Sequence, residues 1–298
     1  MLSTRQLRYF DALSRHLHFG RAAKECAVTQ PALSMQIREM EDMLGVRLVE
    51  RGQGGVRLTV VGEEAAARAR GVLAALGDME RTIRDRGHLL EGRLRLGVIA
   101  SIAPYLLPRL LPEMARRYPG VEIALRESQT DQLVADLAHG DLDLVVLSLP
   151  VEHPALETLA LFDDPFFLAV PEASDAFPEE LASADRILAD DLLLLEDGHC
   201  FRDQALNVCR KVDEKRLRRF GASSLSTLAQ LVANGQGVTL LPEMFVSSEG
   251  GRIPRVRLLP FPDPVPTRTI GLVWRRTLPF RDDVDAVAAM VKACRPGG

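Results

Sequence analysis

The sequence predicts an α/β protein in two parts, a small helical head and a larger body, joined by a long helix. Three observations support this prediction. A length of 298 residues corresponds to about two domains. Basic residues exceed acidic ones by three in residues 1–60, whereas acidic residues exceed basic ones by seven in the rest of the chain. Helical spacing dominates up to residue 86, and strands alternate with helices after residue 92.

The composition excludes several classes of protein. With 47% hydrophobic and 26% charged residues, the chain can bury a sizeable core, which excludes a disordered or fibrous protein. Its apolar stretches are far shorter than the ~18 residues that a membrane span needs. We expect a cytoplasmic protein, because the N-terminus has no apolar signal core. Four cysteines are too few for a secreted disulfide scaffold of this size.

The head has the pattern of three helices. Helical spacing covers residues 4–16 and 19–26, and Thr29 is placed to cap a third helix that ends at Gly45. Leu33, Ile37, Met40 and Leu44 form its expected buried stripe. The rest of this helix offers side chains suited to base edges and phosphates, namely Thr29, Gln30, Pro31, Ser34, Gln36 and Arg38.

Two short strands follow at residues 46–51 and 56–59, around a glycine-rich turn, with Arg51 near the turn. A β-ribbon after three such helices is typical of a winged helix-turn-helix, which places its third helix in the major groove of DNA. We therefore predict a DNA-binding domain over residues 1–60. The alternative is a plain three-helix packing unit.

The connector, residues 61–88, has the pattern of one long helix. No proline occurs between residues 62 and 86, and apolar residues recur at heptad spacing, at Ala65, Ala69, Val72, Leu76, Met79 and Ile83. We predict that this stripe pairs with a second copy of the chain. The alternative is that it packs on the body of its own chain.

The body, residues 89–298, alternates strands and helices. Strands are expected at 92–98, 121–126 and 142–149, with helices at 104–118 and 131–137, which favours a parallel sheet. Ser101 and Thr130 follow the first two strands, so both could face one cleft. Later strands are expected at 166–170, 192–196, 238–241 and 268–274, and later helices at 224–234 and 282–294. Two crossings, near 162–165 and 263–268, divide the body into lobe I (about 92–162 and 268–298) and lobe II (about 163–267).

Cys200 and Cys209 form the most informative pair of the body. Their spacing fits neither a zinc site nor a thioredoxin-type motif. Cys200 is expected at the start of a helix, where free N–H groups, together with His199 and Arg202, favour a thiolate that can be oxidised to a sulfenic acid and then capped by a second thiol. If residues 201–209 are helical, the two Cα atoms lie ~13 Å apart, whereas a disulfide tolerates no more than ~7 Å. Bonding the pair would then require unwinding, unless these are two unrelated apolar cysteines.

Two segments of the head, residues 22–37 and 44–51, resemble LysR-type transcriptional regulators, and the likeness extends to Gly235–Pro242. The resemblance implies a winged helix-turn-helix, a linker helix, and a two-lobed regulatory domain similar to periplasmic binding proteins. It also implies a homodimer that assembles into a homotetramer, binds double-stranded promoter DNA and acts on RNA polymerase.

The motif Gly-His-Cys, with Arg-Asp-Gln-Ala and Cys after it, resembles the peroxide-sensing, OxyR-like branch of this family. The resemblance implies that Cys200 is the peroxidatic cysteine, and that Cys209 resolves it into a disulfide that a glutaredoxin- or thioredoxin-type reductant reopens. It further implies a hydrogen peroxide site made by Ser101, Thr130, His199, Asp203 and Arg268. We expect no metal and no cofactor. The sequence departs from the branch at Ser101, commonly a threonine, and in the charged segment Arg210–Arg216.

The predicted function is a peroxide-responsive regulator that activates transcription, and also represses it, rather than an enzyme. Three alternatives stay open. A LysR-type regulator of a small metabolite would bind it in the cleft between the lobes and leave the thiols incidental. A thiol peroxidase would share the chemistry of Cys200 but has little use for the polar face of the third helix. A solute-binding protein has no use for the head.

Overall fold

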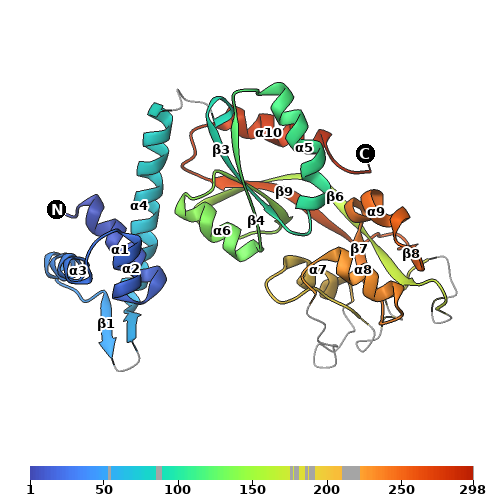
Figure 1. The fold of residues 1–298 in the computed structure, drawn as a ribbon, viewed down its shortest axis with the longest axis horizontal. Helices are drawn as coiled ribbons and strands as arrows, with labels where there is room; N and C mark the ends of the chain where they lie inside the picture. Colours follow the sequence, from blue (N-terminus) through green and yellow to red (C-terminus); the bar gives the residue numbers. More distant parts are fainter. Residues whose placement is uncertain are drawn as a thin grey trace. The chain divides into compact units, whose positions relative to one another are not determined.

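The structure, a computed structural model, describes residues 1–52, 55–84, 89–174, 177, 181–184, 187, 192–209 and 222–297. Its contacts divide the chain into two compact units. One is Met1–Arg84 with Ala138–Asp141, and the other is Asp85–Leu137 with Leu142–Gly298. The first unit holds the helical head, and the second holds the α/β body (Figure 1). The predicted α/β fold class with an N-terminal helix-turn-helix is confirmed.

The head begins with three helices whose ends are set by neighbouring side chains. Their bounds are α1 (Thr4–His16), α2 (Phe19–Glu25) and α3 (Gln30–Leu44). The Ser3 hydroxyl accepts a hydrogen bond from the Gln6 amide at the start of α1, and the Thr29 hydroxyl accepts one from the Ala32 amide at the start of α3. Gly45 ends α3 with a φ of 70°, a conformation that costs glycine little. All three helices match the prediction to within a residue.

Glu41 joins the end of α3 to the wing. Its carboxylate is 4% exposed and accepts hydrogen bonds from the backbone amides of Leu48 at 2.7 Å and Val49 at 3.1 Å. The two strands of the wing, β1 (Val49–Gly52) and β2 (Gly55–Leu58), pair antiparallel. The ribbon is therefore confirmed, but its first strand begins three residues later than predicted, because Glu41 takes up the Leu48 amide.

The connector forms one helix, α4 (Val60–Arg84), which has two different surfaces. Ala69 is buried in the core of the head and Ala65 packs against that core, so the first part of the predicted heptad stripe packs within its own chain. Further along, Val72, Met79 and Ile83 are 54%, 54% and 75% exposed within this single chain. Among the described side chains of the stripe, these three are exposed and could meet a second copy, and that pairing stays a prediction.

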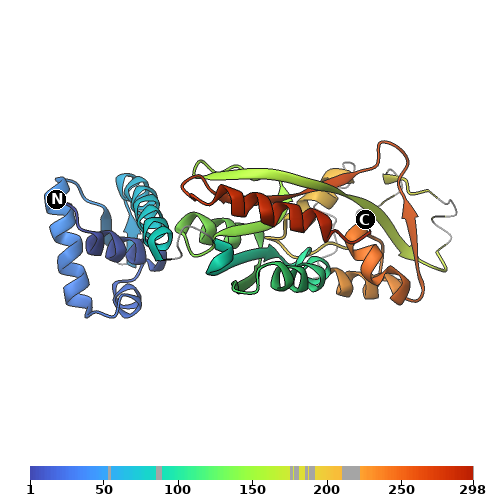
Figure 2. The ribbon, with the colours of Figure 1, turned by 90° about the horizontal axis from the view of Figure 1, so that it is seen from above.

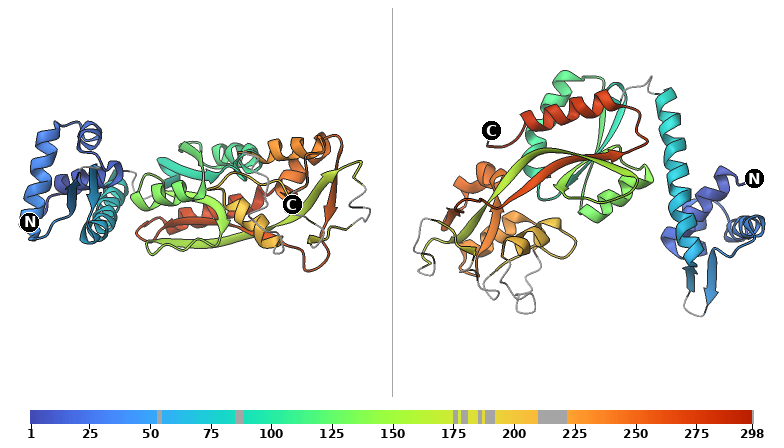
Figure 3. Two further views of the ribbon diagram at one scale, coloured as in Figure 1. Left: turned by 90° about the horizontal axis from the view of Figure 1, so that it is seen from below. Right: turned by 180° about the vertical axis from the view of Figure 1, so that it is seen from behind.

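One twisted sheet organises the second unit, in the order β4-β3-β5-β9-β6-β7, with β8 also paired to β6. The bounds of its strands are β3 (Arg93–Ile99), β4 (Glu122–Ser128), β5 (Leu144–Leu149), β6 (Leu156–Pro171), β7 (Thr239–Pro242), β8 (Val256–Pro260) and β9 (Thr267–Arg275). The long strand β6 runs beside β9 and then pairs with β7 and β8 (Figure 2 and Figure 3). Residues 144–148 of β5 are all buried, as expected for a central strand that is covered on both faces.

The predicted parallel sheet is correct only for β3, β4 and β5. Strand β9 pairs antiparallel with both β5 and β6, because the chain re-enters the sheet from the opposite end. The crossing expected near residues 162–165 is not a loop but part of the continuous strand β6, which changes pairing partners near Phe166. Strand β8 and helix α9 were not predicted.

Helices flank the sheet, and their bounds are α5 (Ala103–Arg117), α6 (Thr130–His139), α7 (Cys200–Val208), α8 (Leu225–Ala233), α9 (Glu243–Glu249) and α10 (Arg281–Ala293), with short 3₁₀ turns at Leu89–Glu91 and Gly250–Arg252. A single apolar cluster extends from β3 and α5 to α7 and α8. Within the described residues, no helix is long and apolar enough to cross a membrane. The charged segment 210–216 lies outside the described residues.

Candidate functional site

Ser101 and Thr130 lie at one edge of the sheet. Strands β3 and β4 are parallel, and Ile99 pairs with Ser128 where both strands end, so the residues that follow them emerge side by side. Ser101 is buried, and Thr130 is half-buried at the start of α6. The Thr130 hydroxyl oxygen is buried and has no hydrogen-bond partner among the described residues. It is therefore available to a small polar ligand at this edge.

Cys200 is the first residue of α7. Gly198 precedes it with a φ of 91°, and His199 is the N-cap but makes no side-chain capping bond. The Cys200 side chain is half-buried and its thiol is free. Cys200 therefore lies in the first turn of a helix, where the backbone amide groups have no partner within the helix.

Gln129 brings the Cys200 loop to the edge that holds Thr130. Its amide nitrogen donates a hydrogen bond to the Asp197 carbonyl at 3.4 Å. A Cβ atom added to Gly198 would lie 2.6 Å from the Gln129 side-chain oxygen, so the two residues are in close contact. The contact between Gln129 and Gly198 thus holds together the two segments that carry Thr130 and Cys200.

Arg268, from β9, is buried next to Ser101. Its guanidinium pairs with Asp164 at 2.9 Å, and it donates hydrogen bonds to the Ser101 hydroxyl at 2.8 Å and the Ser101 carbonyl at 3.1 Å. The Ser101 oxygen accepts from Arg268, so the Ser101 hydroxyl proton is left to point elsewhere. Arg268 therefore holds Ser101 in place at this edge of the sheet.

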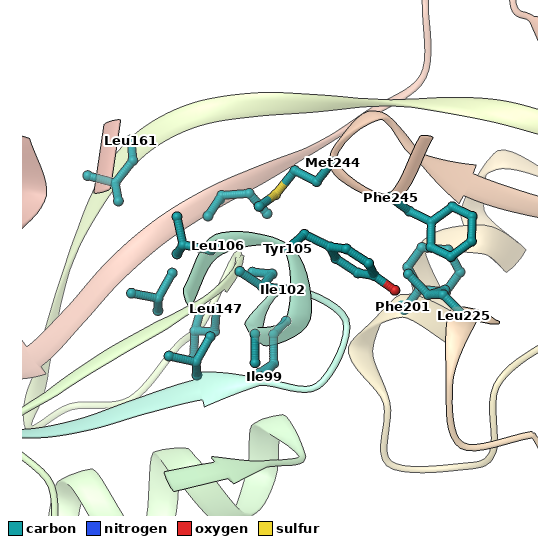
Figure 4. Packing of buried hydrophobic residues seen from close by; sticks show 14 of the residues in the cluster. Ile99, Ile102, Tyr105, Leu106, Leu147, Leu161, Phe201, Leu225, Met244 and Phe245 are labelled. Carbon is teal, nitrogen blue, oxygen red and sulfur yellow. The ribbon is translucent and has the colours of Figure 1, made fainter. Parts of the chain in front are cut away.

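Phe201 links the start of α7 to Arg268. The Arg268 guanidinium carbon lies 5.5 Å from the centre of the Phe201 ring, within the range of a cation–π contact. Phe166 meets the same ring edge-on at 5.7 Å. Figure 4 shows Phe201 in one buried cluster with Tyr105 and Phe245. The residue after Cys200 is therefore anchored in the core.

The positive charges expected beside Cys200 are weaker than predicted. Burial lowers the pKa of His199, and Glu196 opposes this change. The positive charge expected from His199 is therefore disfavoured by its burial. Arg202 pairs with Asp197 at 3.0 Å, which offsets its charge. Asp203 is exposed on α7.

Cys209 caps the other end of α7 and differs sharply from Cys200. It is 2% exposed, and burial raises its pKa to about 11, so it is a protonated thiol at neutral pH. The segment between the cysteines is helical, as predicted, and both thiols are free. Nine residues at ~1.5 Å each separate them by ~13 Å, about twice the reach of a disulfide. This structure therefore holds a dithiol whose bonding requires α7 to unwind.

The second candidate surface is the outer side of α3 in the head. Thr29, Gln30, Pro31 and Arg38 are exposed, whereas Ser34 and Gln36 are half-buried. The Gln36 amide donates to Glu39 at 2.6 Å. The backbone of Arg51 lies in β1, next to the turn of the wing, but its side chain lies outside what the structure describes.

Sequence reasoning missed two residues of these surfaces. Met35 is 55% exposed on α3. Its position in the sequence between Ser34 and Gln36, two residues of the predicted polar face, could have indicated this exposure. Gln129 directly precedes Thr130, but nothing in the sequence shows that its side chain reaches Gly198.

Comparison with known proteins gives matches over nearly the whole chain. The LysR substrate binding domain matches residues 87–295, and the bacterial regulatory helix-turn-helix protein of the lysR family matches residues 4–63. The chain is 40% identical over 296 residues, 99% of its length and 97% of the relative, to the DNA-binding transcriptional dual regulator OxyR of Escherichia coli K12.

Solved structures agree with these matches. A full-length OxyR from Pseudomonas aeruginosa, with a cysteine-to-aspartate substitution, is similar with a TM-score of 0.73 and 34% identity over 99% of this chain and 97% of that one. A cysteine-to-serine mutant of OxyR from Corynebacterium glutamicum, with hydrogen peroxide bound, is similar with a TM-score of 0.66 and 31% identity over 98% of this chain and 92% of that one.

Proposed function

Because the chain belongs to the LysR family of bacterial transcriptional regulators, we propose that it controls transcription in response to hydrogen peroxide. One observation carries this proposal. A half-buried free thiol, Cys200, opens α7 at the edge of the sheet that holds Thr130, whose hydroxyl has no partner in the described part of the chain. A deeply buried thiol, Cys209, closes the same helix. The names of the OxyR relatives support the same reading.

The chemistry needs two steps. The Cys200 thiolate attacks one peroxide oxygen, the O–O bond breaks, and Cys200 becomes a sulfenic acid. The second oxygen leaves as hydroxide, which takes up the proton released when the Cys200 thiol ionised and becomes water. Ser101, Thr130, His199, Asp203 and Arg268 are proposed to hold the peroxide, with Arg268 acting through Ser101. Cys209 then attacks the Cys200 sulfur and a disulfide forms as a second water leaves. A glutaredoxin- or thioredoxin-type dithiol returns two electrons and two protons to restore both thiols.

The difference in burial between the two cysteines supports different stages for them in this reaction. Cys209 is a protonated thiol inside the folded protein, so it is a poor nucleophile while α7 is intact. Unwinding of α7 brings it into a wetter environment, where the thiolate is easier to form. Cys200 is oxidised first, and Cys209 reacts only after the segment rearranges.

The head is proposed to bind double-stranded promoter DNA. The exposed part of α3, with Thr29, Gln30, Pro31, Ser34, Gln36 and Arg38, would lie in the major groove, and Arg51 of the wing would meet phosphates. Met35 adds an exposed apolar side chain suited to the methyl group of a thymine.

The organisation inferred from sequence completes the proposal. A DNA-binding domain (1–60), a linker helix (61–88) and a two-lobed regulatory domain (89–298) would form a homodimer through Val72, Met79 and Ile83, and two dimers a homotetramer. The oxidised and reduced assemblies would place the heads differently on the promoter. RNA polymerase in the cytoplasm would read that difference, giving a regulator rather than an enzyme.

The test compares the wild-type chain with Cys200→Ser, and with Cys294→Ser as a matched control. Cys294 is another buried free cysteine, outside α7. After a stoichiometric dose of peroxide, mass spectrometry should find a Cys200–Cys209 bond in the wild type and in Cys294→Ser. The footprints that the reduced and the oxidised protein leave on the DNA upstream of its own gene should differ. Cys200→Ser should bind DNA but show no change with peroxide, and a normal response in this variant would refute the proposal.

A cavity favours the small-metabolite regulator as a second candidate. A hollow of about 760 Å³ lies against α7, and its lining includes Gln204, Asn207 and Val208 of α7 together with Pro150, Phe261 and Thr269. This volume is in the range of small-molecule sites. A transcriptional response to a metabolite that persists in the Cys200→Ser variant would favour this function over peroxide sensing.

A further inference from the structure

Helix α7 is tied to the sheet by a contact that involves neither cysteine. Gln204 lies four residues after Cys200, and its side-chain nitrogen donates a hydrogen bond to the Ser148 hydroxyl at 2.6 Å. Ser148 lies in the central strand β5 and is 2% exposed. Its hydroxyl in turn points toward the Thr269 carbonyl on β9, at 3.4 Å. The middle of α7 is therefore attached to two neighbouring strands of the sheet.

This contact depends on the helical form of residues 200–208. Gln204 reaches Ser148 because α7 directs its side chain toward β5. Formation of a Cys200–Cys209 bond shortens the distance between the ends of α7 from ~13 Å to less than ~7 Å, so the residues between them leave the helix. Gln204 is halfway along this segment and has to move with it.

The hydrogen bond to Ser148 is important because the structure describes few other polar contacts for the Gln204 side chain. Its side-chain oxygen is buried and has no hydrogen-bond partner among the described residues, so the bond to Ser148 is the one polar anchor that the structure describes for this side chain. Without Ser148, the amide nitrogen would be left unpaired in the same place, at a cost to the helical form.

We propose that Ser148 and Gln204 form a latch that stabilises the dithiol form and so sets how readily the disulfide closes. Both are positioning residues, because they act through α7 and touch neither thiol. The inference rests on the proposed function, since it needs the cysteines to pair. It predicts that breaking the latch shifts the equilibrium toward the disulfide without slowing the first attack of Cys200 on peroxide.

The equilibrium can be measured with the full-length chain in glutathione buffers. The chain's dithiol and one glutathione disulfide exchange to give the Cys200–Cys209 disulfide and two glutathione thiols, so two electrons and two protons are transferred. The fraction of disulfide is read by alkylation and mass spectrometry at several ratios of glutathione to its disulfide. Consumption of a substoichiometric peroxide dose reports the first step separately.

Ser148→Ala is expected to shift this equilibrium about threefold to tenfold toward the disulfide, the range for one hydrogen bond. A tenfold shift corresponds to about 30 mV in the midpoint potential of this two-electron couple. The rate of peroxide consumption should stay within twofold of wild type. Thr269→Val is the matched control, because Thr269 lines the same cavity as Gln204 but its hydroxyl donates to Asp163 rather than holding α7.

A double-mutant cycle separates the latch from a general loosening of the fold. Gln204→Leu should shift the equilibrium as Ser148→Ala does, and the double variant should shift no further than either one, because both remove the same bond. Equal shifts in Ser148→Ala and Thr269→Val, or additive shifts in the double variant, would overturn the latch. A wild-type chain that forms no Cys200–Cys209 disulfide overturns the proposed function and the latch together. A disulfide whose equilibrium Ser148→Ala leaves unchanged overturns the latch alone.

Discussion

The DNA-binding head and the region around α7 are stabilised by contacts of very different sequence separation. In the head, the decisive polar contacts join residues three to seven positions apart, namely Ser3 with Gln6, Thr29 with Ala32, and Glu41 with Leu48. Around α7 they join residues 56, 104 and 167 positions apart, namely Gln204 with Ser148, Arg268 with Asp164, and Arg268 with Ser101.

The difference teaches where a covalent change can act. Contacts between near neighbours form and break with a single helix or turn, so the head keeps its shape as long as its helices are present. Contacts over a long separation disappear when one partner moves, even if every other helix persists. A bond between Cys200 and Cys209 can therefore rearrange α7 while leaving the caps of α1 and α3 intact.

The largest predicted effect comes from the most distant contacts. Asp164 is fully buried, and Arg268→Met removes the partner of its carboxylate. The free energy of unfolding of the second unit, which we call the regulatory unit, should fall by about 3–5 kcal/mol. Trp274 is the chain's one tryptophan and lies in β9, so its fluorescence during urea unfolding reports on this unit. Arg116→Met is the control, because Arg116 is exposed and pairs with Glu113 at the surface. Equal losses in the two variants would contradict the prediction.

The strongest local contact in the head should give the next largest effect. Glu41→Ala leaves the buried amides of Leu48 and Val49 without an acceptor and should cost the head about 2–4 kcal/mol. Hydrogen exchange of these two amides in the full chain should accelerate, and DNA affinity should fall because the wing is released from α3. Glu39→Ala should leave the exchange of both amides unchanged, since Glu39 is exposed. Slow exchange in Glu41→Ala would show that another group holds the wing.

The same contrast explains what the sequence could predict. The three helices of the head were placed to within a residue, because caps such as Thr29 and Gly45 lie beside the turns they set. The dithiol helix was placed from Gly198 and the two cysteines for the same reason. The antiparallel course of β9 and the reach of Gln129 to Gly198 depend on residues more than sixty positions away, and no local pattern records them.

A glycine from each region sharpens the comparison further. Gly45 and Gly198 both have positive φ, but a Cβ at Gly45 would meet open space, whereas one at Gly198 would meet Gln129 at 2.6 Å. Gly45→Ala should therefore cost about 1 kcal/mol for its conformation alone, and Gly198→Ala up to about 3 kcal/mol. Thermal unfolding of the reduced chain measures both. Adding Gln129→Ala should recover part of the loss only in Gly198→Ala, and recovery in neither would place the strain elsewhere.

The smallest predicted effect concerns the titration of Cys209. Burial raises its pKa to about 11 in the folded chain, whereas an unfolded cysteine titrates near ~8.5. The thiol thus contributes stability that is complete below pH ~8.5 and is lost as the pH rises toward 11, because the unfolded chain deprotonates first. At pH 9.5 the reduced regulatory unit should be less stable by up to about 1.4 kcal/mol than at pH 7.5 from this group. Urea unfolding followed by Trp274 should show this loss in the wild type but not in Cys209→Ala. Parallel losses in the two chains would mean that Cys209 is already in contact with water in the dithiol form, and that α7 holds it less tightly than its burial indicates.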